Sequence, residues 1–154
     1  MILRAPRMTR EDIGFVVQCY EDWPDTDRGP VLDYDARSWI KMWNRGNVES
    51  CLIGEENGNP VGLVTFLQNL FVAVVYEIVV HPSHRGMGNA KRMWVELQDI
   101  LRTEGVVVCE FDALPGAITD KVLKGDFEKV GEGVGLHTGL PTVRGRVFAD
   151  TPIA

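Results

Sequence analysis

The chain has 154 residues, of which 45% are hydrophobic and 25% charged, as expected for one globular domain with a sizeable core. Its net charge of −6 disfavours binding to the phosphate backbone of nucleic acids, which requires clustered positive charge. The longest apolar run, about Phe66 to Val80, is too short to span a bilayer and contains Gln68, Asn69 and Glu77, so we expect no membrane partner.

The cysteine pattern argues against disulfides and metal ligation. Cys19, Cys51 and Cys109 are odd in number and far apart, and no Cys-x-x-Cys spacing occurs. We therefore expect free thiols in a reducing compartment and no metal site. The Met-Ile-Leu-Arg start lacks the apolar core of a secretory signal, which favours a cytoplasmic protein.

The N-terminal part predicts a strand, two helices and a second strand. Residues Ile2 to Ala5 form the first strand, and Thr9 caps a helix with Asp12 in a capping-box role. A polar, turn-rich segment leads to a second helix from about Tyr34 to Gly46. Ser50 to Glu55 then reads as a strand.

The rest of the chain predicts a mixed α/β order. Asn57-Gly58-Asn59-Pro60 is a hairpin signal between strands, and Gly105 suits the C-terminal cap of a helix that ends near Glu104. The predicted strands are Pro60–Gln68, Val72–His81, Val106–Leu114, Phe127–Gly131 and Arg144–Ala149, with a short helix at Ala117–Lys124.

The most informative segment runs from Glu77 to Met93, where an apolar strand passes through a glycine loop into an amphipathic helix. Backbone N–H groups of the loop Arg85 to Ala90, together with the positive end of the helix dipole, can bind an anion. Gly86 and Gly88 let the backbone approach the bound group closely. A phosphorylated ligand is therefore expected here.

Spacing separates three kinds of phosphate-binding loop. A P-loop requires a Gly, four residues, a second Gly and then Lys-Ser or Lys-Thr, which this segment does not provide. A dinucleotide fingerprint requires Gly or Ala where Lys91 stands, so that match is poor. An acetyl-CoA loop has Arg or Gln, two residues, Gly, one residue and Gly or Ala, and Arg85, Gly88 and Ala90 fit this pattern.

With the lead-in Ile78-Val79-Val80-His81-Pro82, the strand, loop and helix resemble those of the GNAT superfamily of N-acetyltransferases. The resemblance extends over almost the whole chain and implies one domain, residues 1–154. It implies an α/β fold with a central, mostly antiparallel sheet of about seven strands, flanked by four helices. The sheet would split between its fourth strand, Val72–His81, and its fifth, Val106–Leu114.

The resemblance also implies acetyl-CoA as co-substrate. The fourth strand would pair with the pantetheine amides like an added strand, and the loop amides would hold the pyrophosphate. The residues expected to bind acetyl-CoA are Ile78, Val79, Val80, Arg85, Gly86, Met87, Gly88, Asn89, Ala90 and Lys91.

Acetyl transfer to an amine needs a base, an oxyanion donor and a proton for the leaving thiolate. Glu77 is the first candidate base, because it is a carboxylate within an apolar strand beside the expected split. Glu110 and Asp112 alternate on one face of the fifth strand and are the next candidates. Many family members protonate the thiolate with a Tyr, but Val122 stands at the matching place here, so this proton donor is unassigned.

The acceptor site of the resembled family lies around the first two helices. That segment here is rich in carboxylates, so we expect a positively charged amine, carried by a small molecule, peptide or protein. Trp23 and Tyr34 could shape the pocket or offer a cation–π face. The expected acceptor-binding residues are Trp23, Asp25, Asp27 and Tyr34. The resemblance is also compatible with a homodimer.

Two other functions stay open at this point. A noncatalytic acyl-CoA-binding or interaction module could keep the fold and lose turnover. A dinucleotide-binding enzyme would instead have a fully parallel sheet and bind NAD(H).

Overall fold

A computed structural model gives the arrangement of residues 1–7, 9–19, 50–113, 127–134 and 141–148. The strands are β1 (Ile2–Arg4), β2 (Ser50–Glu56), β3 (Asn59–Asn69), β4 (Val72–Val80), β5 (Val108–Ala113), β6 (Glu128–Val134) and β7 (Pro141–Phe148). The helices are α1 (Arg10–Cys19), the short 3-10 helix η2 (Pro82–His84) and α4 (Asn89–Thr103).

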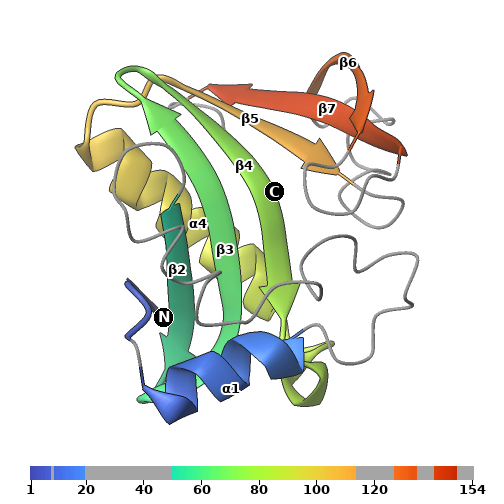
Figure 1. Ribbon diagram of the computed structural model, residues 1–154. Helices are drawn as coiled ribbons and strands as arrows, with labels where there is room; N and C mark the ends of the chain where they lie inside the picture. Colours follow the sequence, from blue (N-terminus) through green and yellow to red (C-terminus); the bar gives the residue numbers. More distant parts are fainter. Residues whose placement is uncertain (8, 20–49, 114–126, 135–140, 149–154) are drawn as a thin grey trace.

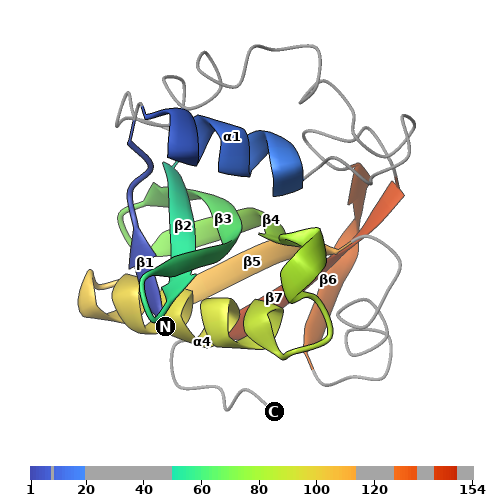
Figure 2. The ribbon, with the colours of Figure 1, turned by 90° about the horizontal axis from the view of Figure 1, so that it is seen from below.

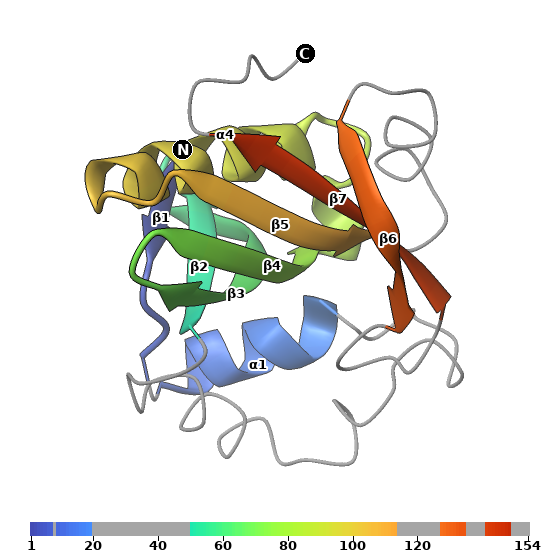
Figure 3. The same ribbon diagram turned by 90° about the horizontal axis from the view of Figure 1, so that it is seen from above.

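The seven strands form one sheet in the order β1-β2-β3-β4-β5-β7-β6. Every neighbouring pair is antiparallel except β4 and β5, which are parallel. Helix α1 covers one face of the sheet and α4 covers the other (Figures 1, 2 and 3). The predicted seven-stranded mixed sheet is therefore confirmed, and the fully parallel sheet of the dinucleotide alternative is wrong.

The helix count differs from the prediction. The described residues contain two α-helices, α1 and α4, rather than the four expected to flank the sheet. The other two expected helices, near residues 34–46 and 117–124, lie outside the described residues. Neither described α-helix combines the length and apolar character needed to cross a bilayer.

Backbone conformation confirms the predicted hairpin turn and the predicted C-terminal helix cap. Asn57 and Gly58 both have positive φ, as a two-residue hairpin turn between twisted strands requires. At the end of α4, Gly105 has φ of 89°, and the Val106 amide donates back to the Leu101 carbonyl. Because the Val106 amide is used in this cap, it does not pair within the sheet, and β5 begins at Val108 and not at the predicted Val106.

Helix α4 approaches the sheet closely because two glycines leave room for Met93. A Cβ added to Gly54 or Gly62 would lie within 3 Å of the Met93 side chain, which is fully buried. The apolar stripe of α4 then packs with the sheet in the larger core cluster, as its spacing predicts. This packing fixes the N-terminus of α4 beside the end of β4.

An ion pair ties α1 to the first strand. Asp12 is 4% exposed and accepts hydrogen bonds from Arg4 Nη1 and Nη2, at 2.8 and 2.7 Å, and from the Arg7 amide. The hydrogen bonds from Arg4, helped by the Arg7 amide, hold the pKa of the Asp12 carboxyl below its ordinary value. The Thr9 hydroxyl accepts from the Asp12 amide, which confirms Thr9 as the helix cap.

Asp12→Asn should lower the free energy of unfolding by about 2 kcal/mol at neutral pH, because it removes one of the two carboxylates that bind Arg4 and leaves only Glu55. Since the folded-state pKa of Asp12 is depressed, the stabilisation is complete above the unfolded pKa of about 4 and is lost as pH falls. Urea unfolding of both proteins between neutral and acidic pH measures this. A stability difference that does not shrink with acidification would contradict it.

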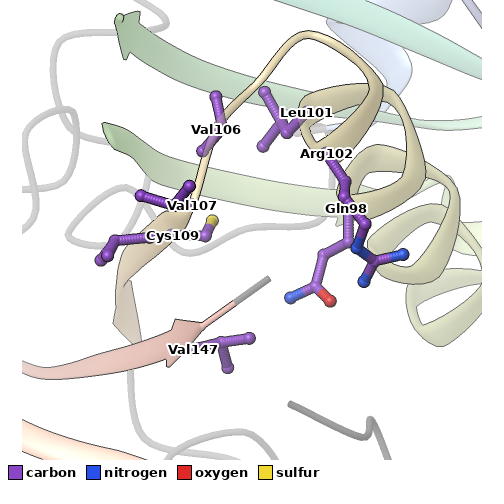
Figure 4. A pocket seen from close by; sticks show the side chains of 8 residues that line it. Gln98, Leu101, Arg102, Val106, Val107, Cys109 and Val147 are labelled. Atoms are coloured by element: carbon purple, nitrogen blue, oxygen red, sulfur yellow. The ribbon is translucent and has the colours of Figure 1, made fainter. Parts of the chain in front are cut away.

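A small cavity lies between α4, β5 and β7, lined mostly by valines and Leu101 (Figure 4). Its volume is about 10 Å³, roughly that of one water molecule. The Gln98 side chain extends from α4 toward Val147 and is 6% exposed (Figure 4). Neither polar atom of this amide has a hydrogen-bond partner among the described residues.

Gln98→Met should therefore stabilise the protein by about 1–2 kcal/mol, because a buried unpaired amide is replaced by an apolar side chain of similar volume. Equilibrium denaturation at neutral pH measures the change. A loss of stability would mean that the amide is satisfied by a buried water molecule, contrary to this interpretation.

Candidate active site

The sheet opens at a bulge in β4. Thr65 of β3 pairs with Glu77, but the next residue, Phe66, pairs with Val75, so Tyr76 is an extra residue in β4. The parallel pairing of β4 with β5 covers Val72 to Val75 and stops at the same point. Beyond it the two strands diverge (Figure 1). The predicted split between the fourth and fifth strands is thereby confirmed.

The bulge also decides which way Glu77 points. Val75, before the bulge, is buried in the core cluster on the α4 face, whereas Val79, after it, is buried with Phe15 and Val16 of α1. Glu77 lies two residues from Val79 and so shares its face, since strand residues alternate. Without the bulge, alternation from Val75 would direct Glu77 into the apolar core beneath α4.

Past the bulge, the open part of β4 forms one wall of a groove. The groove has a volume of about 340 Å³ and is open to solvent. Its other wall is the loop after β4 and the start of α4. The lining residues are Ile78, Val79, Val80, His84, Arg85, Gly86, Gly88, Asn89 and Ala90.

The loop wall is suited to an anion. Gly86 and Gly88 have φ of 75° and 78°, a backbone conformation that residues with a Cβ rarely adopt. The Arg92 amide donates to the Gly88 carbonyl, so the amides of residues 89–91 precede this bond in the first turn of the helix. The positive end of the α4 dipole therefore faces the groove.

Side chains of the loop hold it in shape. The Asn89 amide donates to the His84 carbonyl at 2.9 Å, and Arg85 Nε donates to the Val80 carbonyl at 3.0 Å. His81 stacks on Phe15 of α1, with ring centroids 5.5 Å apart. The Ser83 amide donates to His81 Nδ1, which leaves the proton of the neutral ring on Nε2. The loop is thus braced against both β4 and α1.

Most of the predicted cofactor residues lie together in this groove. Of the ten, only Met87 and Lys91 are not among the lining residues, and both are exposed. Sequence reasoning did not assign His84 to the cofactor site, although it lines the groove. Its position next to Arg85 was the available signal.

The two alternative bases are engaged in ion pairs across the sheet. Arg144 Nε donates to Asp112 Oδ1 at 2.9 Å, and Arg146 Nη2 donates to Glu110 Oε1 at 2.8 Å. These pairs follow from the register in which Asp112 faces Arg144 and Glu110 faces Arg146. The hydrogen bond with Asp112 raises the pKa of Arg144 above its ordinary value. To accept a proton from an amine, each of these carboxylates would first have to give up contacts with its arginine.

The predicted acceptor-binding residues Trp23, Asp25, Asp27 and Tyr34 lie outside the described residues, as does Val122. Within the described ranges, no cluster of His, Cys, Asp and Glu could hold a metal ion. All three cysteines are buried free thiols, as predicted. Burial raises the pKa of Cys19 and of Cys109 to about 12, so neither is a reactive thiolate.

A split mixed sheet with a glycine loop at its opening is the arrangement that the sequence resemblance implied, and comparison with known proteins agrees. Residues 16–116 match the Acetyltransferase (GNAT) family, which is more than half of the chain. The chain therefore belongs to the GNAT acetyltransferase family. No curated protein sequence matches it significantly.

Solved structures share the fold at low sequence identity. A spermidine N-acetyltransferase chimera that includes Vibrio cholerae SpeG is 17% identical, with a TM-score of 0.73 and coverage of 97% of this chain and 96% of that one. An aminoglycoside 6'-N-acetyltransferase complexed with coenzyme A is 12% identical, with a TM-score of 0.67 and full coverage of both chains. The ribosomal-protein-S18-alanine N-acetyltransferase of Escherichia coli is 13% identical, with a TM-score of 0.67, covering 99% and 95%. These similarities show the fold and leave the acceptor open.

Proposed function

We propose that the protein transfers an acetyl group from acetyl-CoA to a primary amine by direct attack of the amine on the thioester. The observation that carries this proposal is the groove between the open edge of β4 and the glycine loop. One wall offers a β4 edge that pairs with no further strand among the described residues, and the other offers an anion site at a helix N-terminus. A long ligand with a diphosphate at one end and amides along its arm fits both walls.

The proposed cofactor pose follows from these two walls. The pyrophosphate binds the loop from Arg85 to Ala90, with Lys91 beside it. The pantetheine amides pair with the backbone of Ile78, Val79 and Val80, as an added strand would. From Val80 to Glu77 the strand rises by about 10 Å, so the arm carries the thioester toward the bulge. The open edge ends there because β5 pairs with β4.

In the proposed reaction, Glu77 accepts a proton from the ammonium group of the acceptor. The amine nitrogen then forms a bond to the thioester carbon. A backbone N–H between Ile78 and Val80 stabilises the oxyanion as the carbon–sulfur bond breaks. The nitrogen releases its second proton and the leaving thiolate takes up one, so that the products are the N-acetylated amine and the free thiol of CoA.

The proposed acceptor is a cationic amine. The support is the acidic segment around Asp25 and Asp27, with Trp23 and Tyr34 as candidate pocket walls. The named activities of the similar structures concern spermidine, an aminoglycoside and a protein alanine, all of which are amines.

Buried free cysteines and the absence of a spanning helix among the described residues are consistent with a cytoplasmic location.

Release of free CoA thiol in the presence of a panel of amines tests the proposal. We expect protein-dependent thiol release with at least one cationic amine, and calorimetric binding of acetyl-CoA but not of NAD. Binding of acetyl-CoA without thiol release would favour a noncatalytic acyl-CoA-binding module. Absence of acetyl-CoA binding would contradict the assignment of the groove.

A further inference from the structure

The side chain of Thr65 in β3 is buried, and its hydroxyl group makes no hydrogen bond with the described residues. Thr65 is 0% exposed, and its Oγ1 atom has no hydrogen-bond partner among the described residues. A buried unpaired hydroxyl destabilises the folded state, whereas a valine would fill the same space without this penalty. An unsatisfied buried group of this kind calls for an explanation.

The register of the sheet places Thr65 next to the proposed base. Thr65 pairs with Glu77 of β4 on one side and with Cys51 of β2 on the other. Directly opposed residues of antiparallel strands have Cβ atoms about 5 Å apart on the same face. The Oε1 atom of Glu77 is also buried. A hydroxyl and a carboxylate are thus neighbours, and the Thr65 Oγ1 and Glu77 Oε1 atoms are both shielded from solvent.

Among the described residues, the other titratable and charged groups near this face are two thiols, three carboxylates, an arginine, a tyrosine and a histidine. Burial keeps the thiols of Cys19 and Cys51 protonated by raising their pKa. Three carboxylates are each bound to an arginine, namely Asp12, Glu110 and Asp112. Electrostatic contacts place Arg85 near Cys19 and Tyr76 near Arg144, and His81 contacts Gln18 and Ser83.

We propose that Thr65 is a positioning residue for Glu77: its hydroxyl donates a hydrogen bond to one carboxylate oxygen while the other oxygen receives the proton of the acceptor amine. This inference rests on the proposed function. The hydrogen bond closes by rotation of the two side chains when the coenzyme occupies the groove, since catalytic hydrogen bonds often tighten only in the complex. The bulge at Tyr76 makes this possible by placing Glu77 on the same face as Thr65.

A hydrogen bond to the ionised carboxylate favours that form, so Thr65 lowers the pKa of Glu77. Thr65→Val should move the acidic limb of the pH dependence of kcat/KM upward by about one pH unit. Thr65→Ser keeps the hydroxyl and should restore the wild-type profile. Thr142→Val is the matched control, because Thr142 is 5% exposed and its Oγ1 also lacks a partner among the described residues.

The same variants can be followed by carbon NMR titration of the Glu77 carboxyl group in the CoA complex, which does not depend on turnover. We expect the titration midpoint to rise in Thr65→Val, and in Thr65→Ala if the valine variant does not fold. An unchanged midpoint and acidic limb, an equal shift in Thr65→Ser, or an equal shift in Thr142→Val would overturn the inference. If no amine is acetylated, the proposed function fails, and the NMR titration still decides the role of Thr65.

Discussion

Gly88→Val is expected to weaken acetyl-CoA binding by at least about 100-fold, a change of roughly 2.7 kcal/mol in binding free energy. Gly88 has φ of 78° and lines the groove, where, among the described residues, an added Cβ would have only Arg92 Nη1 within 4 Å, at 3.7 Å. A branched side chain would therefore project into space that the pyrophosphate needs. It would also disfavour the backbone conformation that aims the loop amides. Calorimetry with acetyl-CoA measures the effect.

Gly58→Val provides a matched control for this experiment. Gly58 has φ of 79° and open space around it, in the hairpin turn between β2 and β3. The backbone strain is the same at both positions, so both variants should lose a similar amount of stability, about 1–2 kcal/mol or more. Only the Gly88 variant should lose acetyl-CoA affinity. If the folded Gly88 variant binds like wild type, the loop is not the cofactor anchor.

Glu77→Gln is expected to lower kcat by about 10²- to 10⁴-fold while leaving acetyl-CoA affinity within a few-fold of wild type. The amide keeps the size of the side chain but cannot accept the proton of the ammonium group. The groove residues from Ile78 to Ala90 remain unchanged. Steady-state kinetics with an active amine, combined with calorimetry, separates the two effects.

Glu110→Gln and Asp112→Asn are the companion variants. Each removes one partner of an ion pair with Arg146 or Arg144, so some stability should be lost. Turnover should stay within about 10-fold of wild type, because the proposed base Glu77 is intact. Retention of full turnover by Glu77→Gln would instead move the base to Glu110 or Asp112.

The sequence was sufficient for the features that depend on local backbone chemistry. The loop from Arg85 to Ala90, the turn at Asn57-Gly58 and the cap at Gly105 are each specified by glycine at positions of positive φ. Element order, together with the family resemblance, predicted the mixed sheet and its split. The signals for the loop, the turn and the cap each lie within a few residues of sequence, so residue spacing can detect them.

Features that depend on the pairing of distant strands were not predictable in the same way. Nothing in the residue types around Tyr76 marks it as the extra residue of a bulge. Yet this extra residue places Glu77 on the opposite face of the sheet. Whether Glu110 and Asp112 meet arginines depends on the register between β5 and β7. A shift of one residue would turn those carboxylates to the opposite face. The contact of Asp12 with Arg4 likewise depends on packing of α1 against the sheet.

The most direct test of the account is mass spectrometry of amines incubated with the protein and acetyl-CoA whose acetyl group is deuterated. Spermidine, an aminoglycoside and lysine-containing or N-terminal alanine peptides form a suitable panel. We predict protein-dependent transfer of the labelled acetyl group to at least one amine, strongly reduced in Glu77→Gln and in Gly88→Val. A protein that binds acetyl-CoA in the groove but labels no amine in a broad panel would contradict the proposed activity.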